Sequence, residues 1–414
     1  MSTVIRKSLL QLVFSGAFMK RWNDRLRPME LMEVDKQAHK MIVAWMLLTR
    51  VTAGMEQAER LALVEETIEG GLFDYFYRLV ITDIKPPVFY KIKANREDYQ
   101  KLTQWVLPQL KPRLAPLGPD FWERMTEALM EPEEKTLSRR ILMAAHLYAS
   151  YSEFRVLKPL NPQDEEMPEI EESFQTRLRG LTDIPGVAEL LSGDNEFSRF
   201  AARAGQLRFQ KRWSQTPRVP ETTVLGHMFL VATYSWFFSV EAGACQARRH
   251  NNFFTGLFHD LPELLTRDII SPVKTSDASI GELIKQYETQ ELERKIIGPL
   301  KSGGCEDLAE RLGYLLGLSV GSEFIATVHE GGEVRHVTES DLRGPKNLDE
   351  LDPKDGPLLK MCDRLAAFIE ADTALRNGIN NEQLHQARWR IRQMYEHRPE
   401  VMGIQVGALL ADFD

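Results

Sequence analysis

The chain has 414 residues, of which 43% are hydrophobic and 27% are charged, and its formal net charge is −8. This length predicts two domains, and the acidic balance argues against binding a nucleic-acid backbone as the main task. The three cysteines, Cys245, Cys305 and Cys362, are odd in number and widely spaced. They argue against a disulfide framework or a CxxC metal knuckle and fit a reducing cytosol.

The N-terminal segment predicts an amphipathic helix rather than a signal peptide. Its apolar stretch is short, is interrupted by Gln11 and runs directly into Lys20 and Arg21. No run of about 18 uninterrupted apolar residues, as a membrane span requires, occurs in the sequence. We therefore expect a soluble, cytoplasmic protein with no membrane partner.

Most of the chain has apolar residues recurring every three or four positions, which predicts helices. In chain order these are Ala38–Thr49, Ala58–Glu69, Leu137–Phe154, Val224–Val240, Ser279–Ile297, Glu306–Leu318 and Leu358–Leu375. Two β-rich runs, Phe324–Val328 and Val334–Thr338, flank a Gly-Gly pair and predict one small hairpin. The acidic stretch Asn161–Glu172 predicts a solvated tether.

Three segments of the first half recur in the same order in the second half. The pairs are Phe18–Trp22 with Phe209–Trp213, Gly71–Val88 with Gly256–Val273 and, more weakly, Met143–Glu153 with Lys360–Glu370. His39 follows the first Phe-x-Lys-Arg-Trp motif and His227 follows the second. Helical proteins reuse Leu, Ala and Phe patterns, which accounts for the weakest pair, but three pairs in one order predict a tandem duplication.

The second half contains residues suited to holding a metal ion. His259 and Asp260 are adjacent, so on a helix their side chains are about 100° apart and can lean toward one ion. Glu263 follows on the same face, one turn along. His227 begins another apolar helix, and Asp363 lies in a helix so apolar that an unpartnered carboxylate there would be costly.

Two imidazoles and two carboxylates form a site with room for water. This donor set favours a divalent transition ion such as Mn, Co or Fe over a closed structural zinc, with Mg, Ni and Zn as further candidates. Such an ion polarises a phosphoryl oxygen and activates water, which is the chemistry of phosphoester hydrolysis. A single His or Asp is usually a core or capping residue, but the ordered set predicts a metal centre.

The ordered residues resemble the HD-domain metal phosphohydrolases, in particular the bacterial 5′-deoxynucleotidases and their eukaryotic relatives, over about 200–375. The resemblance implies an all-α protein with two HD-like helical bundles. The expected organisation is a degenerate HD-like domain over 1–158, an acidic linker with a connecting helix over 159–194, a catalytic HD domain over 195–400 and a C-terminal tail over 401–414.

The resemblance also implies roles for single residues. The implied metal ligands are His227, His259, Asp260 and Asp363. Glu263 would position or activate the attacking water, and Asp268 would assist as an acid or as a contact to ribose. Arg212 and Trp213 would meet phosphate and sugar, a task that suits the planar fork of an arginine. Lys274 would add positive charge, although a lone lysine is more often a solvated loop residue.

The sequence departs from the family pattern just before the first ligand. The family has Ser or Ala and then an acidic residue there, whereas this chain has Leu225 and Gly226. This difference leaves the metal ligands intact and leaves the substrate preference open.

The first copy is predicted to have lost the chemistry and to be retained for packing. In the aligned window, His259-Asp260 becomes Asp74-Tyr75. A rearranged site made of His39, Asp74 and His146 is the alternative. Relatives look like homodimers of single HD domains, so the two copies are expected to form an internal pseudo-dimer; further homo-oligomerisation is left open.

The predicted reaction is metal-dependent hydrolysis of a phosphomonoester, with a nucleoside or deoxynucleoside 5′-monophosphate as the favoured substrate. The expected partner is thus a small phosphorylated molecule and not a nucleic-acid polymer. Two alternatives remain open: hydrolysis of another phosphorylated nucleotide, such as a triphosphate or a signalling nucleotide, and a non-catalytic regulatory or scaffold protein stabilised by metal. Glu263 favours an enzyme, because a structural site gains nothing from an extra carboxylate.

Overall fold

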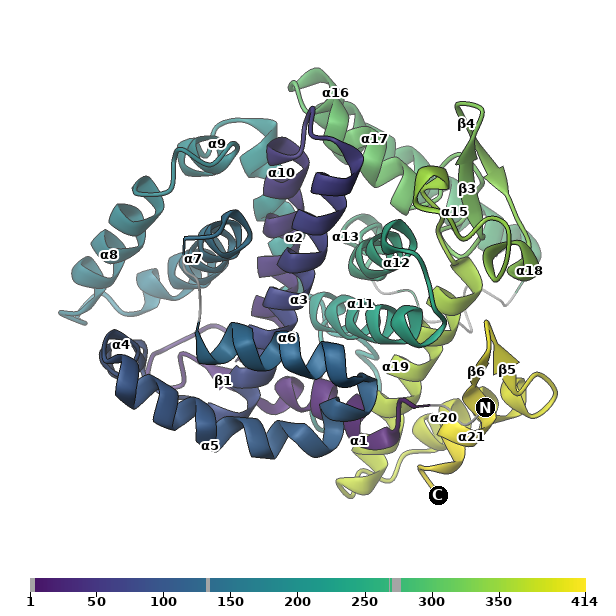
Figure 1. Ribbon diagram of the computed structural model, residues 1–414, viewed down its shortest axis with the longest axis horizontal. Coiled ribbons are helices and arrows are strands. Elements are labelled where there is room, and N and C mark those ends of the chain that lie inside the picture. The colour runs from purple at the N-terminus through teal and green to yellow at the C-terminus, as the bar shows by residue number, and fades with distance from the viewer. Residues whose placement is uncertain (1–3, 132–134, 268, 270–276) are drawn as a thin grey trace.

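The computed structural model describes residues 4–131, 135–267, 269 and 277–414, and helices predominate in this part of the chain (Figure 1). The helices up to residue 195 are α1 (Lys7–Phe14), α2 (Glu33–Val51), α3 (Gln57–Ile81), α4 (Pro86–Ala94), α5 (Arg96–Leu114), α6 (Pro119–Met130), α7 (Leu137–Leu157), α8 (Met167–Arg179) and α9 (Val187–Ser192). The later helices are α10 (Glu196–Gly205), α11 (Val224–Glu241), α12 (Gln246–Phe258), α13 (Glu263–Thr266), α15 (Ala278–Leu292), α16 (Gly298–Ser302), α17 (Glu306–Leu315), α18 (Glu339–Leu342), α19 (Gly356–Arg376), α20 (Glu382–Glu396) and α21 (Val406–Ala411).

The strands of the described residues form small two-stranded antiparallel sheets. They are β1 (Lys20–Arg21) with β2 (Leu31–Met32), β3 (Thr327–Glu330) with β4 (Glu333–His336), and β5 (Glu400–Val401) with β6 (Ile404–Gln405). The predicted all-α class is therefore confirmed, and every helix expected from apolar periodicity is present.

The helix α11 lies at the centre of the molecule. It is apolar on every side, and each residue from Val224 to Ser239 is buried, as expected of a helix that lacks a polar face. Helix α2, which is buried from Glu33 to Leu48, packs against it, and α12 and α19 pack on its other sides. In Figure 1 helices α4 to α9 of the first half lie at the left and bottom, α2 stands at the centre, and most of the second half, green to yellow, lies at the right.

The two halves share one hydrophobic core. A continuous cluster of buried apolar residues includes members from nearly every helix of both halves. The ring of Tyr75 meets that of Phe229 edge-on at 4.9 Å, and Trp45 meets Phe258 at 4.7 Å. Such aromatic pairs add to the stabilisation from burial of apolar area. The two halves therefore pack on each other as parts of one hydrophobic core.

The stretch Asn161–Glu172 differs from the predicted solvated tether. Helix α8 begins within it, and Met167 is buried in a cluster with Phe154 and Leu157 of α7 and its partly buried neighbour Phe174. Apolar residues spaced three to four apart give α8 an apolar face. Because that face packs on α7, the stretch is part of the folded body.

The predicted hairpin is confirmed. Strands β3 and β4 pair in register from Thr327 with His336 to Glu330 with Glu333. The two turn residues, Gly331 and Gly332, have φ values of 64° and 81°. A two-residue hairpin turn with positive φ at both positions favours glycine, which explains the Gly-Gly pair.

The predicted amphipathic helix near the N-terminus is present as α1, whose apolar side chains are buried in the common core. Arg6, just before it, forms an ion pair with Asp412, so the two ends of the described chain lie together. No helix among the described residues combines the length and the apolar composition needed to cross a bilayer.

Candidate metal centre

His227 lies in the first turn of α11. Thr223 caps this helix by accepting a hydrogen bond from the amide of Gly226 at 3.0 Å, which sets where the helix starts. The His227 side chain is fully buried, and its Nε2 lies 3.2 Å from Asp363 Oδ1 and 3.7 Å from Asp260 Oδ2. The predicted ligands from three separate segments are therefore brought together.

His259 and Asp260 stand at the end of α12 rather than inside a helix, because α12 ends at Phe258. The Nδ1 of His259 donates to the carbonyl oxygen of Gly256 at 2.8 Å, which assigns the proton to Nδ1 and leaves Nε2 as a ligand atom. This Nε2 lies 3.2 Å from Asp260 Oδ2 and 3.9 Å from Asp363 Oδ1.

These residues fit one divalent ion. One ligand atom from each of His227, His259 and Asp363 lies within 4.8 Å of the other two, and Asp260 lies within 3.7 Å of both imidazoles. Ligand atoms held about 2.1 Å from one ion are at most about 4.2 Å apart. Only small side-chain adjustments are therefore needed to place all four around a single cation.

The charges of the site favour a cation. Burial acts to raise the pKa of Asp260, but His259 and Arg212 hold it well below its usual range. The pKa of Asp363 is likewise lowered against burial, by Lys360 and both imidazoles. Two ionised carboxylates thus face the imidazole nitrogens. Burial lowers the pKa of His259, yet these carboxylates outweigh it and raise that pKa to about 9.

Glu370, which the sequence analysis missed, supports the site from behind. It lies on α19 seven residues after Asp363 and is only 1% exposed. Its Oε1 is 3.6 Å from Nδ1 of His227 and accepts a hydrogen bond from the Thr222 hydroxyl at 2.7 Å. A carboxylate on this side favours the tautomer with the proton on Nδ1 and Nε2 turned to the ligand atoms. The signal available in the sequence was a second acidic residue two helical turns beyond Asp363.

Replacing Glu370 by glutamine is expected to weaken the affinity for Mn²⁺ by about 10- to 100-fold, because the amide keeps the shape but loses the charge that orients His227. Titration of the metal-free protein with Mn²⁺ measures this change. Asp372→Asn is the matched control, since Asp372 is an equally buried carboxylate of α19 that pairs with Arg376 and Arg388 instead. Equal affinities for the two variants would contradict the role given to Glu370.

Arg212 and Trp213 lie next to the ligands, as predicted. The Nη1 of Arg212 is 3.1 Å from Asp260 Oδ2, and its Nε is 3.5 Å from Glu370. The indole nitrogen of Trp213 donates to Glu370 at 3.0 Å. The guanidinium thus borders the site and links a ligand to the carboxylate behind it.

The structure describes part of the remaining predicted set. Glu263 is buried at the start of α13, and its amide donates to the carbonyl of Asp260 at 3.0 Å. It therefore lies one turn after the His-Asp pair, as the spacing predicted. Asp268 and Lys274 lie outside the described residues.

Gly226, the departure from the family pattern, has a structural cause. A Cβ built on it would lie 2.6 Å from Asp35 Oδ1 and 2.9 Å from the side chain of Val34. The same carboxylate of Asp35 accepts a hydrogen bond from the Thr223 hydroxyl at 2.7 Å. Close packing of the first half on the start of α11 therefore requires glycine at this position.

A second group missed by the sequence analysis lies beside His259. The ring of Phe324 is 6.3 Å from the imidazole, and Lys360 Nζ lies 4.1 Å from the Phe324 ring centre. The pKa of the neighbouring Glu323 is raised by burial, although His259 and Lys360 act in the opposite direction. This loop before β3 lines one side of the centre, and no motif in the sequence identified it.

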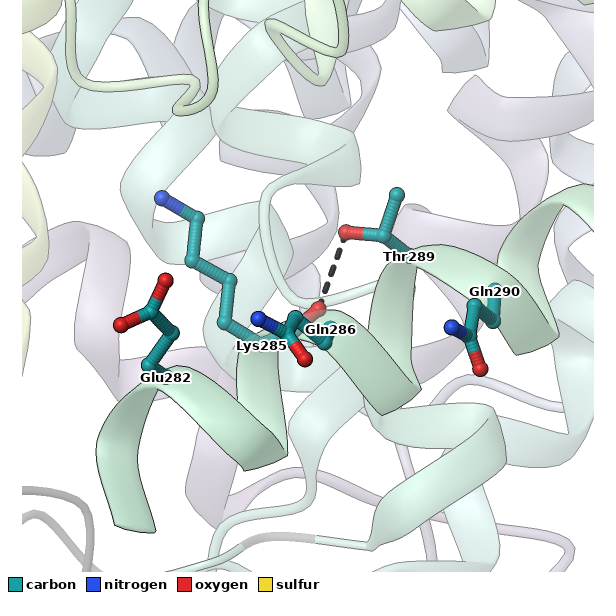
Figure 2. A pocket seen from close by; sticks show the side chains of 5 residues that line it. All are labelled: Glu282, Lys285, Gln286, Thr289 and Gln290. Atoms are coloured by element: carbon teal, nitrogen blue, oxygen red, sulfur yellow. Dashed lines mark hydrogen bonds between the residues drawn. The ribbon is translucent and has the colours of Figure 1, made fainter. Parts of the chain in front are cut away.

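A hollow elsewhere on the surface is unrelated to these residues. It is lined by Glu282, Lys285, Gln286, Thr289 and Gln290, all from α15 (Figure 2). Its one internal hydrogen bond joins the Thr289 hydroxyl to the carbonyl of Lys285 at 2.9 Å, a bond within the helix. None of the predicted site residues lines it.

The alternative site in the first half is wrong. His39 Nε2 bonds to the carbonyl of Ala201 at 2.9 Å, and its Nδ1 lies 3.0 Å from Arg208. Both nitrogens therefore have partners at the contact between the halves, and His39, Asp74 and His146 do not form a group that could hold a metal. In the part of the chain that the structure describes, the His227–His259–Asp363 group is the one set of side chains close enough to hold a metal.

The Arg-Trp segment nevertheless has a counterpart of the same geometry in the first half. Trp22 and Trp213 both have φ of 53°, a rare value for a large residue. The indole of Trp22 donates to Glu153 at 3.0 Å, the same length as the bond from Trp213 to Glu370. The two segments therefore have the same local structure, with the same φ at the tryptophan and a buried glutamate that accepts from its indole.

This correspondence has a fixed register, which pairs Lys36, not His39, with His227. The backbone of Lys20 pairs with that of Met32, and the backbone of Lys211 pairs with that of Thr223. Lys211 lies 191 positions after Lys20, and Thr223 lies 191 positions after Met32. In each half the long central helix begins directly after this pair. Lys36 and His227 are both the fourth residue of their helices, so the match inferred from the motif spacing is corrected by one turn.

Comparison with known families identifies the segment that contains the centre. Residues 204–392 match the family model described as the HD domain. All four predicted ligands and Glu370 lie within this range. No curated protein and no solved structure matches the chain. The match supports a relation of this segment to the HD-domain superfamily, whose members are typically hydrolases.

Proposed function

From the HD domain over residues 204–392, we propose that this chain is a metal-dependent phosphomonoesterase acting on nucleoside or deoxynucleoside 5′-monophosphates. The observation that carries the proposal is the convergence of two imidazoles and two ionised carboxylates on one point, bordered by an arginine. When bound, a divalent cation supplies Lewis acidity, which polarises a phosphoryl oxygen and favours deprotonation of water at the site. Mn, Co and Fe suit this mixed nitrogen and oxygen donor set.

The side chains of the chain itself divide the remaining work. Arg212 offers guanidinium N–H groups that match the geometry of phosphate oxygens, and it is already oriented by Asp260 and Glu370. Trp213, held by its indole N–H, offers a flat apolar surface for a sugar or base. Glu263 accepts the proton of the attacking water, and Asp268 assists as an acid or as a ribose contact.

A screen of phosphoesters tests this proposal. The protein loaded with Mn²⁺ or Co²⁺ is expected to release phosphate from nucleoside 5′-monophosphates faster than from sugar phosphates, nucleoside triphosphates and cyclic or other signalling nucleotides. Elemental analysis of the same preparation should show about one transition ion per chain. A protein that releases phosphate from none of the esters would contradict the enzymatic assignment. A preference for triphosphates would contradict the choice of 5′-monophosphates as the substrate class.

We further propose that the two halves arose by tandem duplication and form an internal pseudo-dimer. The equal backbone of Trp22 and Trp213, the common register of the two strand pairs and the packing of α2 on α11 support this origin. In a dimer of single HD domains the equivalent faces would meet between subunits. Here the same contact is made within one chain, by the common core.

A further inference from the structure

We propose that the first half holds a metal-independent binding site for a small phosphorylated anion, in which Lys36 takes the place of the metal ion. The site comprises Lys36, Lys40, Arg139, Asp74 and His146. It goes beyond the catalytic proposal, because it concerns binding without hydrolysis in the other half of the chain.

In the first half, Lys36 and His146 occupy the positions of two predicted metal ligands, His227 and Asp363. Lys36 stands where α11 has His227, and its Nζ lies 2.8 Å from Nδ1 of His146. His146 lies on α7 seven residues before Glu153, as Asp363 lies seven before Glu370. The lysine thus meets the counterpart of a metal ligand with its own positive charge, and no ion is needed to join the helices.

Two glycines show which residues of the first half correspond to His259 and Asp260. Gly71 packs against the side chain of Met41 of α2, and Gly256 packs against the backbone of Ala232, the position of α11 that corresponds to Met41. The residue three positions after Gly256 is His259, and the residue three positions after Gly71 is Asp74. Asp74 therefore replaces His259, and Tyr75 replaces Asp260.

The charge of the first-half site is opposite to that of the metal centre. The metal centre has two carboxylates at its ligand positions. Here Asp74 is the one carboxylate, and it is shared by Lys40 Nζ at 2.8 Å and Arg139 Nη1 at 3.0 Å. With Lys36 protonated, the three cations Lys36, Lys40 and Arg139 exceed Asp74 by two positive charges.

The surrounding ion pairs do not cancel this excess. Beside the site, three arginines face three carboxylates and balance them: Arg21, Arg78 and Arg208 with Glu33, Asp83 and Glu153. Burial lowers the pKa of Lys36 to about 7, although Glu33 counteracts this. Because Lys36 is then only partly protonated near neutral pH, the surplus lies between one and two positive charges. A phosphate monoester, which carries about −1.5 to −2 at neutral pH, would complement it and favour the protonated lysine.

The exposure of the charged side chains in this group is graded. The side chains of Lys36 and Lys40 are only 3% and 2% exposed, whereas Asp74 is 40% exposed and Arg139 is 18% exposed. His146, which contacts Lys36, is half-buried. An anion entering beside Asp74 would therefore meet Arg139 first and the two lysines beneath it, as in an electrostatic trap.

Binding to the chain with a disabled metal centre tests this site. In His259→Ala protein kept in EDTA, calorimetric titration with inorganic phosphate, with adenosine 5′-monophosphate and with adenosine is expected to show one site that takes the two phosphate-bearing probes and not adenosine. Tighter binding of the nucleotide than of phosphate would identify the ligand as an ester, and the reverse as free phosphate.

Adding Lys36→Met to this background is expected to weaken binding at least tenfold, while Lys101→Met, which changes an exposed lysine on α5, leaves it unchanged. Arg139→Gln, at the opening, gives a second reading should the buried substitution impair folding, and it is expected to weaken binding in the same direction. Absence of binding in EDTA, or binding that Arg212→Ala removes and both first-half variants leave intact, would overturn the proposal. Neither result depends on whether the second half hydrolyses anything, so the two proposals fail separately.

Discussion

The His259→Ala chain is expected to fold normally, to retain no stoichiometric Mn²⁺ and to release phosphate from nucleoside monophosphates at the background rate. The imidazole Nε2 faces both Asp260 and Asp363. Its removal takes one predicted ligand away, and the repulsion between the two buried carboxylates is then no longer offset by this imidazole. Loss of an outer partner of a ligand typically costs 10- to 100-fold, and loss of the ligand itself should cost more than about a thousand-fold in kcat/KM.

His39→Ala is the matched control for this prediction. His39 is also a buried imidazole, and its hydrogen bonds go to Ala201 and Arg208 rather than to the metal centre. This variant is expected to keep its metal content and activity, even where its melting temperature falls. Metal content measured by elemental analysis, together with steady-state kinetics, distinguishes the two variants. A His259→Ala protein that binds metal and hydrolyses substrate at the wild-type rate would show that the centre lies elsewhere.

The second large effect is expected from Glu263→Gln, which should keep the metal and lose about 10²- to 10⁴-fold in kcat, the usual contribution of a general base. The amide has the shape of the carboxylate but cannot accept the proton of water. Glu263 lies at the start of α13, where its amide donates to the carbonyl of Asp260, and it is not one of the four predicted ligands. Metal content should therefore remain near one ion per chain.

This variant also separates an enzyme from a metal-stabilised scaffold. Glu306→Gln is its control, because Glu306 occupies the first turn of α17 in an exposed position. Full activity in Glu263→Gln with metal retained would favour the scaffold interpretation. Joint loss of metal and activity would instead make Glu263 a ligand, so the three outcomes are distinguishable by measuring both quantities on one preparation.

The metal centre was predictable from the sequence because its identity depends on residue types in a set order. His227 and Asp363 stand in segments whose apolar periodicity predicts buried helices, and the adjacent His259 and Asp260 supply the other imidazole and carboxylate. A polar side chain in such a setting needs a partner, and imidazoles and carboxylates together point to an ion. The all-α class and the hairpin at Gly331-Gly332 were predictable for the same reason, since both follow from local patterns.

Other features depended on which helices meet, and only the tertiary structure decided them. Glu370 supports His227, although 143 positions separate the two residues, and nothing in either local pattern gives their 3.6 Å approach. Spacing from the Phe-x-Lys-Arg-Trp motifs paired His39 with His227. The strand pairs show instead that Lys36 is the counterpart, because register is set by hydrogen bonds between segments and not by the nearest histidine.

The sequence alone therefore determined the helices and the class of fold, which follow from short-range periodicity, and it predicted the four metal ligands from the chemistry of residue types. The tertiary structure decided that Asn161–Glu172 packs on α7, that Gly226 is required by Asp35 and that Lys36 meets His146 in the first half. These last three depend on close packing between segments distant in the chain, where a shift of one helical turn changes which side chains meet.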